Sequence, residues 1–379
     1  MGSVALGSSV WSGAVRAAGE LATQGPSPYG ALLPPDANGI MLPAGFTSRV
    51  LARGAQEVIP GSGFIWHTAP DGGAVFPKDD GGWVYVSNAE RVFPSGGASA
   101  LRFNSIGEII DAYTILDGTL LNCAGGATPW GTWLSCEEYP LGLAFECDPD
   151  GIASSAARPA LGSFAHEAAV FDDVGRCYLS EDEGDGGFYR FTPDTVGDLS
   201  AGILEMAGLD VAGNVTWYEV TNPNPDLLGG ETATRLQNPG LTTPFDGGEG
   251  LVHHSGNVYL TTKGDDTVWH YDVVADVMCP LYVAALDGPD PVLTGVDNIT
   301  VSQEGRLIVA EDGGNMELVM ITNDLVAAPI LRIVGQDSSE ITGPSFDPLG
   351  VRLYLSSQRG EAQGITYEIF GPFPDFLHC

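Results

Sequence analysis

One short phrase occurs six times in the chain, and this repeat limits the possible fold more than any other feature. Each copy has a Gly, a short run of β-branched, aromatic and aliphatic residues, and a closing small residue. The closing residues lie 48, 45, 81, 49 and 46 residues apart: Ser87, Ser135, Ser180, Thr261, Ala310 and Ser356. A period of roughly 40–50 residues is typical of a four-stranded propeller blade. The sequence therefore predicts an all-β fold, a six-bladed β-propeller.

The interval of 81 residues between Ser180 and Thr261 departs from this period. It holds either an insertion around residues 222–239 or a degenerate seventh blade near Trp217 and Tyr218. Because residues 231–244 have the composition of a loop, we expect six blades with an insertion in this interval. We expect residues 1–40 to be an N-terminal arm or a residual export segment, and residues 41–379 to be a single propeller domain.

The charge of the chain excludes one class of partner. Its 15 Lys and Arg residues stand against 49 Asp and Glu residues, a formal net charge of −34. Such a field repels phosphate backbones, so we expect no nucleic-acid partner. A protein with several Ca²⁺ sites and a protein adapted to a salty medium both have this composition. No apolar run reaches the roughly 18 residues of a membrane span.

Two rows of polar residues lie at equivalent places in the repeats. Before each Gly comes another short apolar run, which predicts a β-hairpin. At the starts of the first strands stand Cys123, Glu167, Glu249, Asp297 and Asn298. Just after the second strands stand Glu90, Glu138, Glu183 and Asp312. The start of one hairpin strand lies beside the end of the other, so both rows are expected at one end of the channel.

Alignment on the closing small residue puts Glu90, Glu138 and Glu183 in the same place and favours Glu138 over Glu137. So many carboxylates at one place repel one another unless cations neutralise them, so the two rows predict a metal centre. The alternative is that each acidic residue simply follows a strand because turns are polar. Thiolate suits iron, whereas carboxylate and amide oxygens suit calcium.

The remaining Cys and His residues have simpler interpretations. The six cysteines form no CxxC pair, which excludes a zinc ribbon and a thioredoxin motif. Cys177 lies within a strand and is expected in the core, and Cys136 with Cys147 is a possible disulfide if the protein is exported. His67 and His166 are candidates to orient ligands. A turn is expected at His253 and His254.

Residues 122–138, NCAGGATPWGTWLSCEE, resemble the signature of the PhoX-type alkaline phosphatases. Further segments resemble that family in order, so that the resemblance runs from about Gly61 to Gly364: residues 162–172, 178–191, 297–305, 310–313 and 343–348. The resemblance implies a six-bladed propeller of exported bacterial enzymes that hydrolyse phosphomonoesters with iron and calcium. It therefore implies a periplasmic or secreted protein, with a phosphorylated small molecule as substrate. We expect a monomer.

Carried onto matching positions, the resemblance implies two sets of metal ligands. The iron side is Cys123 with Glu90, Glu167 and Glu249, and the calcium side is Glu138, Glu183, Asp297, Asn298 and Asp312. Two positions depart from the family pattern, because Ala89 stands where a His is usual and Gly247 where an Arg would grip phosphate. Arg359 and Lys263 are the candidate substitutes, since each follows a second strand. The alternative is that both are merely charged residues on the solvated surface.

Three functions follow as hypotheses. The first is a metal-dependent phosphoester hydrolase of the PhoX type, with Cys123, Glu90, Glu167, Glu249 and Arg359 at its catalytic centre. The second is a calcium-dependent propeller lactonase or esterase, which needs Ca²⁺ alone, so a thiolate at Cys123 argues against it. The third is a non-catalytic, metal-stabilised binding propeller, suggested by the missing Arg and His.

Overall fold

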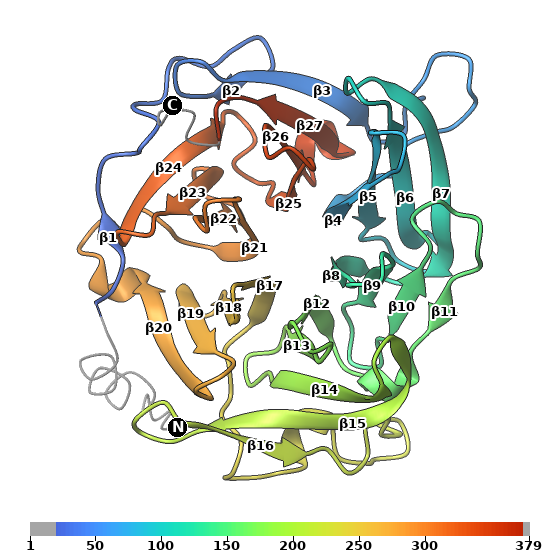
Figure 1. The fold of residues 1–379 in the computed structure, drawn as a ribbon, viewed down its shortest axis with the longest axis vertical. Coiled ribbons are helices and arrows are strands. Elements are labelled where there is room, and N and C mark those ends of the chain that lie inside the picture. Colours follow the sequence, from blue (N-terminus) through green and yellow to red (C-terminus); the bar gives the residue numbers. More distant parts are fainter. Residues whose placement is uncertain (1–19, 374–379) are drawn as a thin grey trace.

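Six largely antiparallel sheets surround a central channel in the computed structural model, which describes residues 20–373 (Figure 1). Each sheet is one blade, and its strands run from the channel outward. The prediction of a six-bladed β-propeller is therefore confirmed. The only helical elements of the described residues are four short 3₁₀ turns: η1 (Pro159–Leu161), η2 (Thr234–Leu236), η3 (Ala284–Leu286) and η4 (Gly360–Ala362). Among these residues, no helix is long and apolar enough to cross a membrane.

The blades follow one another along the chain. Blade 1 contains β4 (Pro70–Pro77), β5 (Trp83–Ala89), β6 (Gly96–Phe103) and β7 (Ile109–Thr119). Blade 2 contains β8 (Asn122–Ala127), β9 (Trp133–Glu137), β10 (Ala144–Cys147) and β11 (Ala156–Ala157). Blade 3 contains β12 (His166–Phe171), β13 (Cys177–Glu181), β14 (Phe188–Thr195), β15 (Asp198–Leu209) and β16 (Val215–Glu219). Blade 4 contains β17 (Gly248–His254), β18 (Asn257–Thr262), β19 (Thr267–Asp272) and β20 (Val277–Val283).

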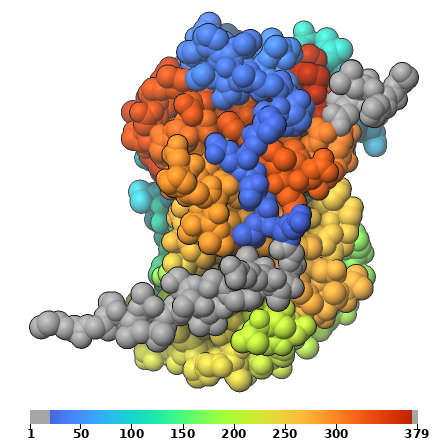
Figure 2. Space-filling model, turned by 90° about the vertical axis from the view of Figure 1, so that its left-hand side faces the viewer, coloured from blue at the N-terminus to red at the C-terminus, as the bar shows by residue number. Residues whose placement is uncertain are grey.

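The last two blades include strands from the start of the chain. Blade 5 contains β21 (Val296–Val301), β22 (Leu307–Glu311), β23 (Glu317–Ile321) and β24 (Val326–Ile333), and β24 also pairs with β1 (Thr23–Gln24) and β2 (Ile40–Met41). Blade 6 contains β25 (Ile341–Phe346), β26 (Arg352–Ser357) and β27 (Ile365–Phe370), and β3 (Thr47–Arg53) is its outermost strand. Figure 2 shows this early segment lying across the outer surface of the later blades.

The pairing of β3 with β27 closes the ring. Thr47 lies opposite Phe370 and Arg53 opposite Ile365, so the two ends of the propeller meet within one sheet. Part of the expected arm, residues 20–40, is held against blade 5 through β1 and β2. The segment interpreted as a residual export signal lies outside the described residues.

The long interval between Ser180 and Thr261 contains an insertion, as expected. Trp217 and Tyr218 belong to β16, a fifth strand that pairs with the outer edge of blade 3. They do not begin a seventh blade. A long connection with η2 then leads from β16 to blade 4.

Small residues allow the innermost strands to approach one another around the channel. A Cβ on Gly72 would lie 2.5 Å from Cα of Ala124 in the next blade, and one on Gly250 would lie 2.6 Å from N of Ile299. Any side chain at these positions would push two blades apart, since contacts this short are repulsive. The glycines therefore set the narrow radius of the inner ring.

The possible disulfide between Cys136 and Cys147 does not form. Both thiols are free and buried. Cys136 lies opposite Ala144 and Cys147 lies opposite Trp133 on the paired strands β9 and β10, so the two cysteines are offset along the ladder rather than facing one another. A disulfide needs close Cβ atoms that point toward each other. Cys177 is fully buried in the core, as its place in a strand predicts.

Candidate metal centre

Two rings of side chains lie at the end of the channel where the innermost strands begin. The inner ring is formed by the second residue of each innermost strand: Asp71, Cys123, Glu167, Glu249, Asp297 and Thr342. In blades 1 to 5 the strand register shifts between the first and fourth residues of this strand, at or next to the ring position. Such a bulge alters the direction of a side chain relative to a regular strand.

The outer ring is formed by the first residue after each second strand. In every blade its backbone N–H donates to the residue two positions before the inner-ring residue, as from Glu138 to the carbonyl of Leu121. This shared bond defines the ring: Glu90, Glu138, Asp182, Lys263, Asp312 and Gln358. Both rows of residues thus lie at the same end of the channel, as the predicted hairpins require.

The two rings bring potential metal ligands together in three groups. The first is Cys123, Glu138 and Glu167, and the second is Glu167, Glu249 and Asp297. The third is Asp71, Glu90 and Glu340. Within each group the ligand atoms lie within 4.8 Å of one another. Because Glu167 belongs to two groups, those two form one continuous centre.

The donor atoms of this centre fit cations. One oxygen of Glu167, Oε2, is buried without a hydrogen-bond partner, a costly arrangement for a carboxylate. The Cys123 thiol donates to Glu167 Oε1 at 3.3 Å, which brings a sulfur ligand into the same group. Carboxylates with unmet bonding capacity beside a thiol are suitable ligands for a metal that accepts both oxygen and sulfur.

Burial dominates the electrostatics of the carboxyl groups. It raises the pKa of Glu138 to about 9, assisted by the charges of Asp182 and Glu249. It raises the pKa of Glu340 to about 9 and that of Asp71 to about 7, with neighbouring carboxylates adding to both. Burial also raises the pKa of the Cys123 thiol well above its ordinary value. Without a bound cation, these groups therefore hold protons that a metal must displace.

Two basic side chains contact the acidic rings. Lys263 Nζ lies 2.5 Å from Glu249 Oε1 and 3.3 Å from Asp182 Oδ2. Although burial lowers the pKa of Lys263, these two carboxylates raise it well above its ordinary value, so the side chain is an ammonium. Arg359 lies 3.0 Å from Glu340 and 3.2 Å from Asp312. Both candidate substitutes from the sequence therefore contact carboxylates of the centre, while the Lys263 side chain is 38% exposed and that of Arg359 45% exposed.

Three amide side chains hold the rings in place. Gln358 Nε2 donates to Asp71 Oδ2 at 2.6 Å and to Glu90 Oε2 at 2.7 Å, so it joins two members of the third group. Asn88 Nδ2 donates to the carbonyl oxygens of Cys123 and Ala124, which fixes the backbone that carries the thiol. The Asn298 amide donates to Asp297 Oδ1 and accepts from Gly343 N, so it orients a neighbouring ligand.

The structure places Glu183 apart from the other candidates. Asp182, not Glu183, is the outer-ring residue of blade 3, and Glu183 lies 3.7 Å from Arg235 of the insertion. The expected equivalence of Glu183 with Glu90 and Glu138 is therefore wrong. The buried Glu181 ends its strand directly after the closing residue Ser180, whereas Glu137 ends its strand two residues after Ser135. Alignment on the closing residue therefore selects a position one residue too late in blade 3.

Glu137, Glu181 and Glu311 form a separate, structural set. Each ends the second strand of its blade and accepts hydrogen bonds from nearby backbone N–H groups. In blade 2 this leaves Glu138 as the residue in the thiol group. Glu138, favoured over Glu137 by the sequence alignment, is thus the one of the two that lies beside the thiol.

The histidines lie beside the centre or far from it. Burial lowers the pKa of His166 to about 4 and that of His67 to about 3, so both rings are neutral. His166 Nε2 contacts the carbonyl of Gly162, and His67 Nε2 contacts Ser87 Oγ, so each is fixed next to a strand of the centre. His253 and His254 end β17 at the opposite end of the channel, where a turn was expected.

Sequence reasoning missed Asp71 and Glu340. Asp71 precedes its closing residue Ser87 by sixteen residues, whereas Cys123, Glu167, Glu249 and Asp297 precede theirs by twelve or thirteen. The longer hairpin of blade 1 hides the equivalence. The signal that could have found Asp71 is its place directly before Gly72, at the start of a short apolar run.

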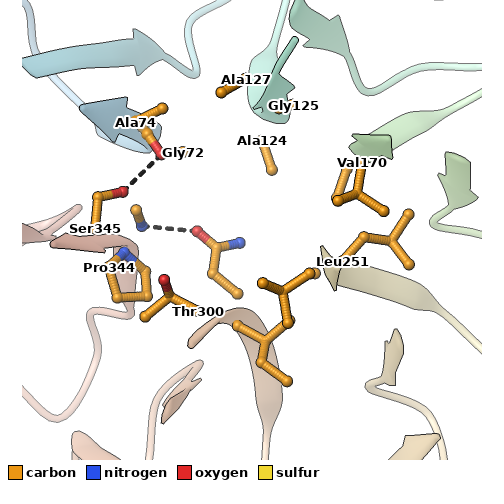
Figure 3. A pocket seen from close by; sticks show the side chains of 18 of the residues that line it. Gly72, Ala74, Ala124, Gly125, Ala127, Val170, Leu251, Thr300, Pro344 and Ser345 are labelled. Atoms are coloured by element: carbon orange, nitrogen blue, oxygen red, sulfur yellow. Dashed lines mark hydrogen bonds between the residues drawn. The ribbon is translucent and has the colours of Figure 1, made fainter. Parts of the chain in front are cut away.

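A cavity of about 350 Å³ lies in the channel directly behind the inner ring. It is lined by the next residues of all six innermost strands, and Figure 3 shows Ala124, Val170, Leu251 and Pro344 around it. Most of the labelled side chains are small or apolar. The charged groups therefore gather at the mouth of the channel, and its interior offers them little solvation.

The comparisons with known proteins begin with a family model. The model described as alkaline phosphatase PhoX matches residues 88–141 and 139–268, which include Glu90, Cys123, Glu138, Glu167 and Glu249. No curated protein sequence matches the chain.

Solved structures share the fold. PhoX of Pseudomonas fluorescens, solved in complex with the transition-state analogue vanadate, superposes with a TM-score of 0.72 at 17% identity, covering 90% of this chain and 97% of that one. A gluconolactonase from Xanthomonas campestris has a TM-score of 0.53 at 13% identity, covering 91% and 99%. A protein of unknown function from Dyadobacter fermentans has a TM-score of 0.53 at 11% identity, covering 88% and 99%. At these identities the likeness shows the fold alone.

Fold and site together define a six-bladed β-propeller with a carboxylate-rich centre at one mouth of its channel. The family match covers much of that centre. The chain belongs to the PhoX alkaline phosphatase family, a family of phosphomonoesterases.

Proposed function

We propose that this chain hydrolyses phosphomonoesters at a centre that holds iron and calcium between the two rings. The observation that carries the proposal is the combination of one thiol and several buried carboxylates with two cationic side chains. A site for Ca²⁺ alone needs no sulfur ligand. A phosphate dianion, in turn, needs positive charge that carboxylates alone do not supply.

The ligand groups suggest how the metals divide. Cys123, Glu138 and Glu167 would hold iron, because thiolate binds iron well and calcium poorly. Asp71, Glu90 and Glu340 offer oxygen alone and would hold calcium. This division differs from the one that the family resemblance implies, in which Glu90 lies on the iron side and Glu138 on the calcium side. When bound, the metals would polarise the phosphoryl oxygens and activate an oxygen nucleophile.

The protein's own residues bind and orient the substrate. Lys263 and Arg359 now pair with carboxylates, and those same carboxylates belong to or adjoin the ligand groups. Once their carboxylate partners are neutralised by metal, the ammonium and the guanidinium are available to phosphate oxygens. Gln358 keeps Asp71 and Glu90 at a fixed separation through its two hydrogen bonds.

The direct test combines metal analysis with an activity assay. The protein is purified without added metal, its iron and calcium contents are measured, and hydrolysis of p-nitrophenyl phosphate is followed with and without a chelator. We expect both metals and an activity that the chelator abolishes. Absence of iron contradicts the proposal, and calcium alone with hydrolysis of a lactone or carboxyl ester supports the lactonase hypothesis. Metals without any phosphatase activity support a binding propeller.

The resemblance to exported enzymes also supports a proposal about location and assembly. We propose that the protein acts as a monomer in the periplasm or outside the cell. Phosphorylated small molecules would then reach the mouth of the channel from that compartment. Fractionation of the native host and the molar mass in solution test these two statements.

A further inference from the structure

The loop between β5 and β6, residues 91–95, lies at the rim of the metal centre. It follows directly on Glu90, whose carboxylate is held by Gln358 in the third ligand group. The carbonyl of Arg91 accepts from Leu121 N at 2.7 Å, which ties the loop to the residue two places before Cys123. The loop therefore spans the rim where blades 1 and 2 meet.

Arg91 differs from the other basic residues of the described chain. Among residues 20–373, it is the one Lys or Arg whose side chain makes no hydrogen bond and no ion pair, in a protein with a net charge of −34. Arg91 is also exposed. An unpaired guanidinium beside the mouth of an acidic site attracts an anionic ligand toward that mouth.

Phe93 presents an apolar surface on the same loop. Its side chain is 68% exposed and that of Val92 is 64% exposed. Exposed aliphatic residues such as Val174, Val274 and Leu349 lie in hairpin turns at the other end of the blades. Phe93 instead lies at the end that carries the centre. An exposed aromatic ring is available to stack on a flat partner.

The loop is within reach of a bound substrate. The three residues from Glu90 to Phe93 span at most about 11 Å even when fully extended. A phosphoryl group held at the ligand groups would direct its ester oxygen and leaving group toward the open side of the rings. The leaving group would then lie toward the rim, where residues 91–95 are.

We propose that Arg91 and Phe93 form a subsite for the leaving group and that it favours aryl phosphates. This proposal rests on the proposed phosphomonoesterase function and adds its substrate class. Phe93 stacks on the aromatic ring of the leaving group, and Arg91 attracts the dianion. Neither side chain takes part in the bond changes.

Two non-hydrolysable probes test the subsite by calorimetric titration of the protein as purified with its metals. Phenylphosphonate and methylphosphonate share the anionic group and differ in the ring. We expect the wild type to bind phenylphosphonate about tenfold more tightly, a difference of about 1.4 kcal/mol. Phe93→Ala should remove this preference without changing the affinity for methylphosphonate, and Phe93→Tyr should keep it.

The control variant is Val196→Ala, which removes an equally exposed apolar side chain from a turn at the opposite end. It should change neither affinity. Arg91→Gln should weaken both probes about threefold at low salt and reduce the salt dependence of binding, while Arg91→Lys should retain both properties. A wild type with no preference for phenylphosphonate, or a Phe93→Ala variant that keeps the preference, overturns the proposal.

A separate assay distinguishes failure of the subsite from failure of the function. Hydrolysis of phenyl phosphate and glycerol 2-phosphate is measured on the same preparations. Ring-selective binding without hydrolysis of either ester contradicts the proposed function and leaves the subsite supported. Hydrolysis of both esters without ring-selective binding supports the function and rejects the subsite.

Discussion

Cys123 is the proposed sulfur ligand, the residue that would separate an iron-binding centre from a purely calcium-binding one. Its thiol contacts Glu167, its backbone carbonyl accepts from Asn88, and carboxylates surround it. Burial and these charges raise its pKa, so an unassisted thiolate is disfavoured. Only a bound cation offsets that cost, because the cation stabilises the ionised form directly.

Cys123→Ala should therefore lose iron. We expect the affinity for iron to fall by at least about tenfold, since removal of even an outer hydrogen-bond partner of a metal ligand has an effect of that size. Elemental analysis of the purified variant measures this. Cys177→Ala is the matched control, because Cys177 is a buried thiol in the core away from the rings. If Cys123→Ala keeps its iron, the thiol is not a ligand.

Lys263→Met should weaken phosphate binding without removing metal. The ammonium contacts Glu249 and Asp182, and a charged hydrogen bond to phosphate is worth about 1.5–3 kcal/mol. We expect inhibition by orthophosphate to weaken by roughly 10–100-fold. Lys78→Met is the control, since Lys78 pairs with Asp150 in the turns at the other end. Unchanged inhibition together with lost metal would mean that Lys263 acts only on Glu249.

At the scale of strands and blades, Asn88 connects β5 of blade 1 to blade 2. Its amide donates to the carbonyls of Cys123 and Ala124, and its Oδ1 accepts from Trp133 Nε1 at 2.9 Å and Ser135 Oγ at 2.8 Å. All four bonding positions are used in a fully buried place. The residue therefore fixes the distance between two blades and the position of the thiol.

Asn88→Ala should destabilise the protein by about 3 kcal/mol, because it leaves buried polar partners without bonds. Denaturant unfolding of the metal-free protein measures this. Asn323→Ala is the control, since Asn323 is exposed and its side chain bonds only to the carbonyl of Glu304. Equal losses of unfolding free energy in the two variants would contradict the bridging role.

The elements differ in how far the sequence predicts them. The hairpins of the inner strands follow from Gly turns and apolar runs, which are local signals, and with them the count of six blades. Glu183 was misplaced because the closing residue Ser180 lies one position nearer the end of its strand than the closing residue of blade 2 does. The outer-ring residue is therefore Asp182, and the small residue alone does not indicate this shift. Glu340 lies two residues before the ring position of its strand, where no other repeat has an acid. Gln358 joins Asp71 and Glu90 only because the ring closes between blades 6 and 1.

At the scale of the whole molecule, the centre makes stability depend on pH. Asp71, Glu249, Glu138 and Glu340 have folded-state pKa values raised to about 7, 8, 9 and 9. Their unfolded values lie near 4, so the folded metal-free state binds more protons between these limits. Its stability is then greatest below the unfolded pKa values and falls as the pH rises through the folded values.

We therefore expect the melting temperature of the chelator-treated protein to fall between about pH 5 and pH 9. Bound iron and calcium should flatten this dependence, because cations stabilise the ionised carboxylates. Calorimetric scans across the range, with and without metals, measure both effects. A melting temperature of the metal-free protein that rises over this range would show that the carboxylates are ionised without metal.

The closure of blade 6 has a consequence for how the chain is made. During synthesis β3 emerges before blades 1 to 5, whereas its partner β27 emerges after them. Until then β3 has no strand partner. The conformational entropy lost by joining such distant segments is therefore lost in one late step. Blades 1 and 6 also cannot bring Asp71, Glu90 and Glu340 together before that step. The group of Asp71, Glu90 and Glu340 therefore forms only after ring closure, whatever the order in which the other blades fold.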